Sequence, residues 1–212
     1  MEETMIDSSL LSCRDFAALL GSAEPAPGGG GAAALTGALG AALGEMVGSL
    51  SRGKASLEPY AQELEKAGEE LERLRLELLD AIQGDAKGFL PLAAAYRISK
   101  EDPQRSAVIE SASQEACAVP LRIMELCVEA LEPLSVMAQY GSKLARSDAG
   151  CAAALLRSAL EAGGLNLLVN SRSYRDKPWA KKLEDKADKL LGRGLSQAGE
   201  IYRLVYDYLA GE

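Results

Sequence analysis

Apolar residues recur at helical spacing along most of this 212-residue chain. Between Leu57 and Ala95 they step by alternate fours and threes, and Glu, Arg and Lys fill the positions between them. This spacing is typical of an amphipathic helix that packs in a bundle. The apolar seam of this helix consists of Tyr60, Leu64, Ala67, Leu71, Leu74, Leu78 and Ala81. A similar pattern predicts a last amphipathic helix from Pro178 to Tyr208.

Two other segments, 32–50 and 147–170, consist mostly of small and apolar residues. The first contains one charged residue, Glu45, in about five turns of helix, so we expect it to be buried nearly all round. Its glycines recur every four residues and let another backbone approach, either from the same chain or from a second subunit. These glycines are Gly40, Gly44 and Gly48. Because Ala and Gly give weak transfer free energy, we expect no membrane association.

Local signals mark the first helix and its end. Ser12 followed by Asp15 resembles a capping box, which predicts a short helix that ends near Gly21. The sequence PAPGGGG at 25–31 contains two prolines and four consecutive glycines. We expect it to interrupt the helices and to follow a tight backbone path.

Prolines and a serine predict the later boundaries. Pro103 can open a helix, Pro120 is expected to kink it, and Pro133 is expected to end it and could begin another. Ser147 is expected to be the N-cap of the next helix, with Asp148 in its first turn.

The composition agrees with a helical fold. The chain is rich in Ala, Leu and Glu and only 5% aromatic, which favours helices over sheets. No linker, repeat or sheet pattern interrupts the series of helices. We therefore predict one all-α domain over residues 1–212, a helical bundle with long, closely packed small-residue helices.

Charge and residue inventory exclude several functions. The formal net charge of -8 opposes binding to the phosphate backbone, so we expect no nucleic-acid partner. The absence of histidine excludes His-containing zinc sites, Ser-His-Asp triads and imidazole bases. Acid-base chemistry must therefore use Asp, Glu, Lys, Tyr or Cys, and we expect no metal.

Cysteine usage and the N-terminus indicate a cytoplasmic protein. The four cysteines lack CxxC spacing, and three lie among apolar helical residues, so we expect reduced core cysteines. They are Cys13, Cys117, Cys127 and Cys151. The first residues, with Glu2, Glu3 and Asp7, lack the basic and apolar regions of a secretory signal.

Asp85 occupies a position where the seam of the helix at 57–95 should continue. Extending the alternation by four residues from Ala81 leads to this carboxylate, and Gly84 and Gly88 leave space beside it. A carboxylate in an apolar seam must be paired, hydrogen-bonded or protonated, and a group with a raised pKa can serve as a general acid or base. The alternative is a solvated residue after a bend at Gly84.

Asn166 and Asn170 lie four residues apart and share one helix face. Two carboxamides suit recognition of a ring amide, and a turn at 162–164 would leave space beside them. The alternative is a polar bridge between helices. Asp148, next to Ser147, is explained on its own by the helix N-terminus.

The glycine run and two basic residues are candidates for anion binding. Exposed amides before a helix favour anions, and the alternative is a permissive turn that lets helices pack closely. The glycines concerned are Gly28, Gly29, Gly30 and Gly31. Arg52 and Lys54 follow the first apolar helix and could bind an anionic substrate, unless they are simply solvated.

Taken together, these blocks resemble the formiminotransferase-cyclodeaminase/cyclohydrolase family. PAPGGGGAAALTGALGAALGEMV at 25–47 resembles the family's P-x-PGGG-S-x-AA-x-x-GALGAAL-x-x-MV signature. SRGK at 51–54, followed by Tyr60, resembles its later G-K-x-Y region. SDAGCAAALLRSALEAGGLNLLVN at 147–170 resembles its SD-x-G-x-AA block and the helix ending in N-x-x-x-N. One position departs from the signature, since the serine usual after three glycines is Gly31 here.

The resemblance implies an all-helical homodimer with a folate substrate and one of two reactions. One reaction closes 5-formiminotetrahydrofolate to 5,10-methenyltetrahydrofolate with loss of ammonia, and the other hydrolyses the methenyl form to 10-formyltetrahydrofolate. The match begins near the N-terminus, so we expect only this ring step and no formiminotransferase half. A non-catalytic helical folate-binding or scaffolding protein of the same fold is the alternative.

Both reactions move protons on and off a tetrahedral carbon, which carboxylates and a lysine can do without a cofactor. The acid-base candidates, in order, are Asp85, Asp148 and Lys54. Amides of the glycine loop could hold part of the folate, while the basic residues meet its glutamate tail and the asparagines meet its ring. The binding candidates are Gly28, Gly29, Gly30, Arg52, Asn166 and Asn170.

Overall fold

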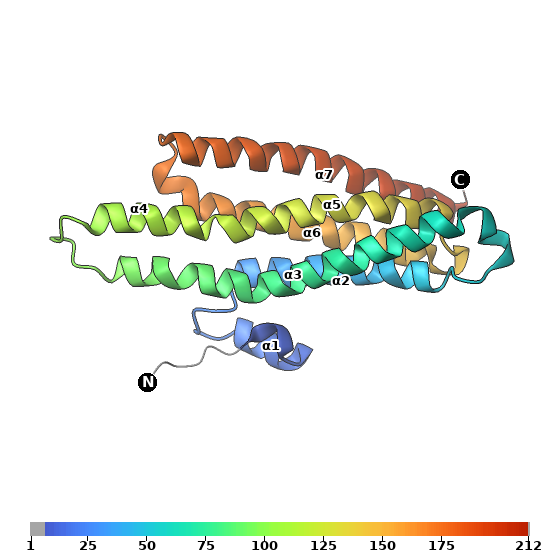
Figure 1. The fold of residues 1–212 in the computed structure, drawn as a ribbon, viewed down its shortest axis with the longest axis horizontal. Coiled ribbons are helices and arrows are strands. Elements are labelled where there is room, and N and C mark those ends of the chain that lie inside the picture. The colour runs from blue at the N-terminus through green and yellow to red at the C-terminus, as the bar shows by residue number, and fades with distance from the viewer. Residues whose placement is uncertain (1–6, 212) are drawn as a thin grey trace.

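The computed structural model describes residues 7–211, so Glu2 and Glu3 lie outside the described residues. All regular structure in this part of the chain is helical, as predicted. The α-helices are α1 (Cys13–Leu20), α2 (Gly29–Ser49), α3 (Ala61–Tyr96), α4 (Arg105–Ala116), α5 (Ala118–Tyr140), α6 (Arg146–Ser171) and α7 (Pro178–Ala210). The 3-10 helices are η1 (Ser8–Leu10), η2 (Ala55–Tyr60), η3 (Lys143–Ala145) and η4 (Arg172–Tyr174). Figure 1 shows the long helices side by side in an elongated bundle, with α1 on its outside.

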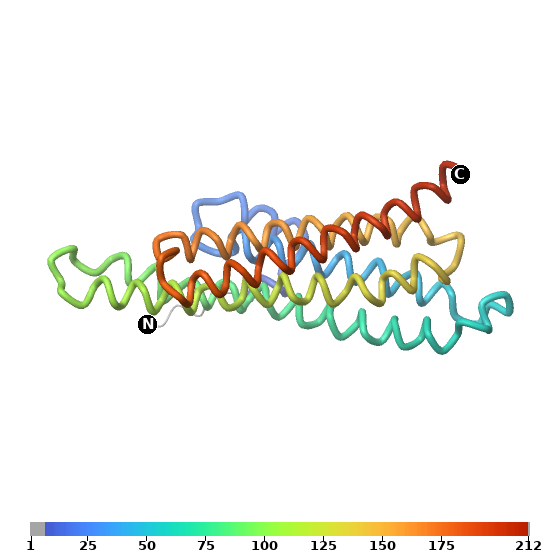
Figure 2. The backbone as a smooth tube through the Cα atoms, turned by 90° about the horizontal axis from the view of Figure 1, so that it is seen from above, coloured from blue at the N-terminus to red at the C-terminus, as the bar shows by residue number. Residues whose placement is uncertain are grey.

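Helix α2 packs between α3 and α6 and also contacts α5. Gly29 lies against Asn166, and Gly40 lies against Leu156, so α2 and α6 run in opposite directions. The view from above in Figure 2 shows these helices following the same long axis. The two ends of α2 therefore lie at well-separated levels of the bundle.

The glycines that recur every four residues in α2 are used for packing inside the chain. A Cβ atom at each of them would come within 2.8–2.9 Å of a neighbouring side chain. The contacts are Gly40 with Leu156, Gly44 with Leu71 and Gly48 with Met137. These glycines bring α3, α5 and α6 close to α2, so they give no reason to expect a second subunit on this face.

The seam of α3 agrees with its prediction. Residues 64, 67, 71, 74, 78 and 81 are all buried. Tyr60 instead ends η2, is partly exposed, and stacks on Tyr140 with 4.3 Å between ring centroids. The predicted start at Leu57 was early, because a 3-10 turn containing Pro59 precedes the α-helix.

The first helix agrees with its prediction, whereas the glycine run does not. Ser12 caps α1 by accepting the Asp15 amide, and the helix stops before Gly21. Helix α2, however, begins at Gly29, so three of the four glycines form its first turn instead of preceding it. The missing side chains admit polar groups from α3 and α6 to this turn, as described below.

Two predicted proline effects were wrong. Pro133 lies inside α5 and is buried, because packing on the surrounding helices outweighs the one backbone hydrogen bond that proline removes. The break in the preceding segment falls at Cys117, and Pro120 lies in the first turn of α5. Helix α4 begins at Arg105, two residues after Pro103.

The structure also corrects the start and middle of α6. The helix begins at Arg146, so Ser147 is not its N-cap; η3 leads directly into it, and Asp148 is in the first turn as predicted. No turn interrupts residues 162–164. Gly163 and Gly164 stay helical because side chains from α5 and α7 pack against them.

The cysteines are free, but only two belong to the core. Cys117 and Cys127 are buried, whereas Cys13 and Cys151 are exposed, which corrects the prediction for the exposed pair. By length and composition alone, Gly29–Ser49 and Lys143–Tyr174 could span a membrane. Core helices of a bundle have the same character, and 56% and 44% of the apolar windows in these two segments are buried.

Candidate functional site

Asp85 lies against the first turn of α2. A Cβ atom on Gly30 would be 2.1 Å from its Oδ1 atom, so only glycine leaves room for this carboxylate. The amide of Gly31 donates a hydrogen bond to it. Gly28, the N-cap of α2, offers no side chain, so Asp85 supplies from α3 an acceptor that the helix start otherwise lacks.

Burial raises the pKa of the Asp85 carboxyl above its usual value, and the hydrogen bond from Gly31 opposes this only in part. Desolvation disfavours the charged form of a carboxyl group, whereas a donated amide favours it. Asp85 is half-buried, so its carboxyl group is partly removed from water but still accessible to solvent. A carboxyl with a raised pKa holds its proton to higher pH than an exposed carboxyl does, which suits a general acid or base.

Asn166 reaches the same turn from α6. A Cβ atom on Gly29 would lie 3.0 Å from its Oδ1 atom and 3.1 Å from its Nδ2 atom. Nδ2 donates to the carbonyl oxygen of Ala162, one turn earlier, at 2.8 Å. Because Gly29 and Gly30 have no side chains, Asn166 and Asp85 can contact the backbone at these two positions. We call Gly28–Gly31, Asp85 and Asn166 the glycine-end cluster.

Gly31 has a different neighbour. A Cβ atom there would lie 3.2 Å from the Cβ atom of Pro27, a tight but not impossible contact. The serine of the family signature would fit only if Pro27 moved by a few tenths of an ångström. Glycine at position 31 avoids the contact with Pro27, and it also lacks the hydroxyl group that the serine would provide.

Asn170 does not join the cluster. Its Nδ2 atom donates to the carbonyl oxygen of Ala116, the last residue of α4, at 2.9 Å. It bridges α6 to the end of α4, which is the structural alternative raised for it. The two asparagines share a helix but contact different elements.

Lys54 lies beyond the opposite end of α2. Its Nζ atom donates to the hydroxyl of Ser142, whose amide in turn donates to Oγ of Ser51 at 2.8 Å. Ser51 Oγ donates to the carbonyl oxygen of Val47 at 2.6 Å. These bonds fix Lys54 to the last turn of α2 and to the loop before α6, where Asp148 also lies in the first helical turn.

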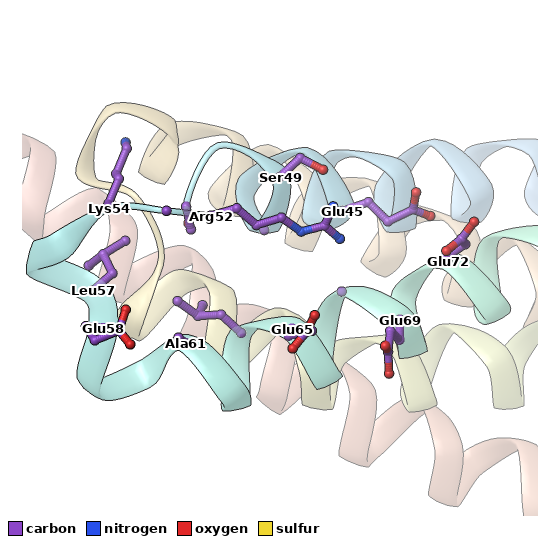
Figure 3. Close-up of a pocket in the computed structure, with 15 residues that line it drawn as sticks. Glu45, Ser49, Arg52, Lys54, Leu57, Glu58, Ala61, Glu65, Glu69 and Glu72 are labelled. Atoms are coloured by element: carbon purple, nitrogen blue, oxygen red, sulfur yellow. The ribbon is translucent and has the colours of Figure 1, made fainter.

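A cleft opens beside this end of α2, between it and the start of α3 (Figure 3). Its volume is about 380 Å³. In Figure 3 the Arg52 side chain extends along the cleft towards Glu45, which is paired with Arg75 at 2.6 Å. The acidic residues of the lining are Glu45, Glu58, Glu65, Glu69 and Glu72. We call this end of α2, with the cleft, Arg52, Lys54 and Ser142, the lysine end.

Several of these residues were missed by sequence reasoning. Ser51 and Ser142 gave no signal, because a hydroxyl that links two loops has no characteristic spacing. The glutamates of the cleft could have been found in part, since residues 65, 69 and 72 follow one face of α3, and Glu58 precedes them in η2. No cluster of three or more Cys, Asp or Glu side chains suitable for a metal occurs within residues 7–211.

The candidate catalytic residues fall into two groups within one chain. Asp85 belongs to the glycine-end cluster, whereas Lys54 and Asp148 lie at the lysine end. The residues between Gly30 and Ser49 span roughly 30 Å at the rise of an α-helix. A set formed by Asp85, Asp148 and Lys54 therefore cannot act on one atom within a single chain.

Comparisons with known proteins give consistent results. A sequence profile described as formiminotransferase-cyclodeaminase matches residues 12–189. Methenyltetrahydrofolate cyclohydrolase from Methylorubrum extorquens is 34% identical over 192 residues, which cover 89% of this chain and 90% of that protein. Formimidoyltransferase-cyclodeaminase from Rattus norvegicus is 28% identical over 204 residues, and the match covers 94% of this chain but only 37% of that protein.

A solved structure shares the fold. The crystal structure of formiminotetrahydrofolate cyclodeaminase from Thermotoga maritima superposes with a TM-score of 0.82 at 28% sequence identity. The match covers 95% of this chain and 97% of that one. The bundle is therefore the arrangement found in that cyclodeaminase.

Proposed function

This chain belongs to the formiminotransferase-cyclodeaminase family, and we propose that it catalyses a ring step on the one-carbon unit of tetrahydrofolate. Relatives named for both ring steps match it over about nine-tenths of its length. The observation in the structure that supports the proposal best is Asp85, a partly desolvated carboxyl with a raised pKa beside the N-terminus of α2.

Hydrolysis of 5,10-methenyltetrahydrofolate is the first choice of reaction. The cyclohydrolase relative is 34% identical and matches over 90% of its own length. Formiminotetrahydrofolate cyclodeaminase activity is the second choice, because a cyclodeaminase structure has the same fold over 97% of its chain. Both reactions pass through the same kind of tetrahedral carbon, so one site could serve either.

The proposed chemistry needs proton transfers at named atoms. In hydrolysis, water adds its oxygen to the methenyl carbon and the bond from that carbon to N5 breaks; one water proton ends on N5 and the other is released. Asp85 would accept a proton from the attacking water and return one to N5. In ring closure, N10 attacks the formimino carbon, and the nitrogen that leaves takes the N10 proton and one more to depart as ammonia.

Substrate binding would use both charge and backbone. Apart from the Gly31 amide, which Asp85 engages, the amides of the first turn of α2 suit an electron-rich edge of the ring, since a helix N-terminus favours negative charge. Arg52 and Lys54 suit the carboxylates of the glutamate tail. Asn166, at the glycine end, is the better candidate of the two asparagines for contact with the ring, because Asn170 is engaged with Ala116.

We extend the proposal to the cofactor, the partner and the compartment. Proton transfer by carboxylate and lysine suffices for either reaction, so we propose that no cofactor takes part. We propose a homodimer in the cytoplasm, without a nucleic-acid or membrane partner. The net charge of -8 supports the exclusion of nucleic acid.

A spectrophotometric assay with both substrates tests the function. Purified protein is mixed with 5,10-methenyltetrahydrofolate or with 5-formiminotetrahydrofolate, and methenyl absorbance and ammonia are followed. Loss of methenyl absorbance supports the cyclohydrolase, and its appearance with ammonia supports the cyclodeaminase. A melting temperature that rises with folate while neither substrate is consumed would instead support the non-catalytic alternative.

A further inference from the structure

Helix α3 continues beyond the level at which α2 begins (Figure 1). The residues of α3 that lie against glycines of α2 recur at steps of seven, four and three. They are Leu71, Leu78, Ile82 and Asp85. The last of them, Asp85, lies against Gly30 in the first turn of α2. A further step of four leads to Phe89, so Phe89 lies on the same side of α3, one turn beyond the start of α2.

Phe89 is partly open to solvent, although the side of α3 that carries it is buried along α2. Its exposed fraction is 38%, because α2 begins at Gly29 and does not extend to the level of Phe89. Residues 21–25, which lead into α2, are themselves exposed. The chain has one other phenylalanine, Phe16, and it is buried in the core. Phe89 is therefore the phenylalanine that a ligand at the glycine-end cluster can touch.

Helix α6 continues past the start of α2 in the same way. Asn166 lies against Gly29, and Val169, three residues later, is 55% exposed. Gly29 itself is exposed, so a ligand can reach the first turn of α2 from solvent. Beyond the polar groups of the glycine-end cluster, the sides of α3 and α6 that face α2 thus continue with apolar residues.

Asp85 and Phe89 are neighbours on one helix face. The Cβ atoms of residues four apart on a helix are about 5–6 Å from each other. A flat group that rests on the Phe89 ring therefore has one edge within reach of the Asp85 carboxyl. Lys87, midway between these two residues in sequence, lies on the opposite side of α3, so it does not repel a cation bound at Phe89.

The substrates of both proposed reactions carry a positive charge at the reacting carbon. In 5,10-methenyltetrahydrofolate this carbon joins N5 and N10, and the flat amidinium group that they form shares one charge. The formimino group of the other substrate is an amidine, which is protonated near neutral pH. A cation within about 6 Å of the centre of an aromatic ring is attracted to the face of that ring. An aliphatic side chain of similar size offers no such attraction.

We propose that the ring of Phe89 stacks on the cationic amidinium group of the folate and positions the reacting carbon beside Asp85. The inference rests on the proposed function and adds a residue that selects a cationic one-carbon unit over a neutral one. Phe89 contacts the substrate but exchanges no proton with it. Hydrolysis yields a neutral formyl group, which loses the attraction to the ring, so the same contact favours release of the product.

Substitutions at Phe89 test the contact by separating ring chemistry from apolar area. Phe89→Leu keeps an apolar side chain without an aromatic ring, and Phe89→Tyr keeps the ring. Leu90→Ala is the matched control, because Leu90 is 47% exposed and points about 100° away from Phe89 around the helix. For each protein, kcat and KM are measured with 5,10-methenyltetrahydrofolate. The Ki of 5-formyltetrahydrofolate, a neutral analogue, is measured as a competitive inhibitor.

Phe89→Leu should raise KM at least about fivefold, whereas the Ki of the neutral analogue should stay within about twofold of wild type. Phe89→Tyr and Leu90→Ala should keep the wild-type KM. An unchanged KM in Phe89→Leu, or equal increases in KM and Ki, would overturn the proposal, because the ring would then contribute no attraction for charge. If Phe89→Leu fails to fold, phenylalanines with one to three ring fluorines replace Phe89, and KM should rise with each fluorine; a constant KM across this series overturns the proposal.

The proposed function can fail separately from the role of Phe89. If wild-type protein consumes neither folate, the ring-step activity is wrong, and calorimetry then compares the affinities of wild type and Phe89→Leu for both folates. A loss of affinity for the methenyl form alone supports the contact with Phe89. Equal losses for both folates, no loss, or no binding by wild type would overturn it. If wild type is active and Phe89→Leu matches it in KM and Ki, the function stands and the role of Phe89 is wrong.

Discussion

The two ends of α2 differ in the way they present charge. At the glycine end, one carboxylate lies half-buried against backbone that has no side chains, and burial raises its pKa. At the lysine end, cationic and acidic side chains line an open cleft of about 380 Å³. Removal from water changes the proton affinity of a group, whereas an exposed mixture of charges mainly attracts a charged ligand.

From this difference we expect the two ends to have separate roles. We expect substitutions at the glycine end to lower turnover. We expect substitutions of Arg52 or Lys54 to weaken substrate binding in addition to lowering turnover. The predictions below test the role of the glycine end, starting with the largest effect. The substitutions at Asp85, Gly30 and Asn166 are each compared with a matched residue that lacks the same surroundings.

Asp85→Asn should lower turnover at least 100-fold with the fold intact, because a positioned general acid-base group typically contributes about 10²–10⁴. The asparagine oxygen can still accept the Gly31 amide, so the start of α2 should survive. Asp80→Asn, at an exposed carboxylate on the same helix, is the control and should keep full activity. Initial rates and circular dichroism of both variants decide, and near-normal turnover of folded Asp85→Asn would move the proton transfer elsewhere.

Gly30→Ala should have the next largest effect. Its Cβ atom would come within 2.1–2.5 Å of the Asp85 carboxyl group, so the carboxyl group must leave the first turn of α2. We expect turnover to fall at least tenfold and the free energy of unfolding to fall by about 1–3 kcal/mol, typical for strain at a packed position.

Gly28→Ala is the control for that loop. Gly28 has negative φ and open space around the position of a Cβ atom, so alanine should be tolerated. Urea unfolding and initial rates should separate the two variants clearly. Equal losses in both would show that the loop needs backbone freedom and not space for Asp85.

The sequence was sufficient for most of the fold but not for contacts between helices. The seam of α3 was predictable because side chains three and four residues apart must share a face. The Pro133 boundary was wrong because tertiary packing can hold a helix across a proline, and no local pattern reports that packing. The glycine run was misread for a related reason, since the groups that need its space come from α3 and α6.

The candidate site shows the same limit. Asp85 was predictable because it interrupts a regular apolar seam, and the structure places it half-buried at the start of α2. Its distance from Lys54 was not predictable, because family blocks give order along the chain and not position in space. The role of Asn170 also needed the structure, since Ala116 lies on another helix.

The two asparagines should respond differently. Asn170→Leu removes the bond to Ala116, so it should lower the free energy of unfolding by about 1–3 kcal/mol and spare folate affinity in the folded protein. Asn166→Leu should weaken folate binding by about 1–3 kcal/mol, since Asn166 lies at the glycine end. Melting temperature and affinity are measured for each. A stability loss without an affinity loss in Asn166→Leu would remove it from the site.

The smallest expected effect is on the pH dependence of stability. Because burial raises the pKa of Asp85 in the folded protein, the folded state binds its proton more tightly than the unfolded state does. Between the usual value of 3.8 and the raised value, the folded state therefore holds more protons, and stability falls as pH rises through that window. Asp85→Asn lacks this contribution to the pH dependence of stability, while carboxyls with lowered pKa values, such as Glu70 and Glu77, contribute equally to both proteins.

The difference in unfolding free energy, wild type minus Asp85→Asn, isolates Asp85. It should be largest near pH 4, decrease as pH rises, and become constant once Asp85 is ionised in the folded state. Urea titrations at half-unit steps between pH 4 and pH 7 measure it. A difference that grows with pH would mean that the Gly31 amide stabilises the carboxylate more than burial destabilises it. The glycine end would then be a helix cap more than a proton-transfer site, and its contrast with the lysine end would lose its basis.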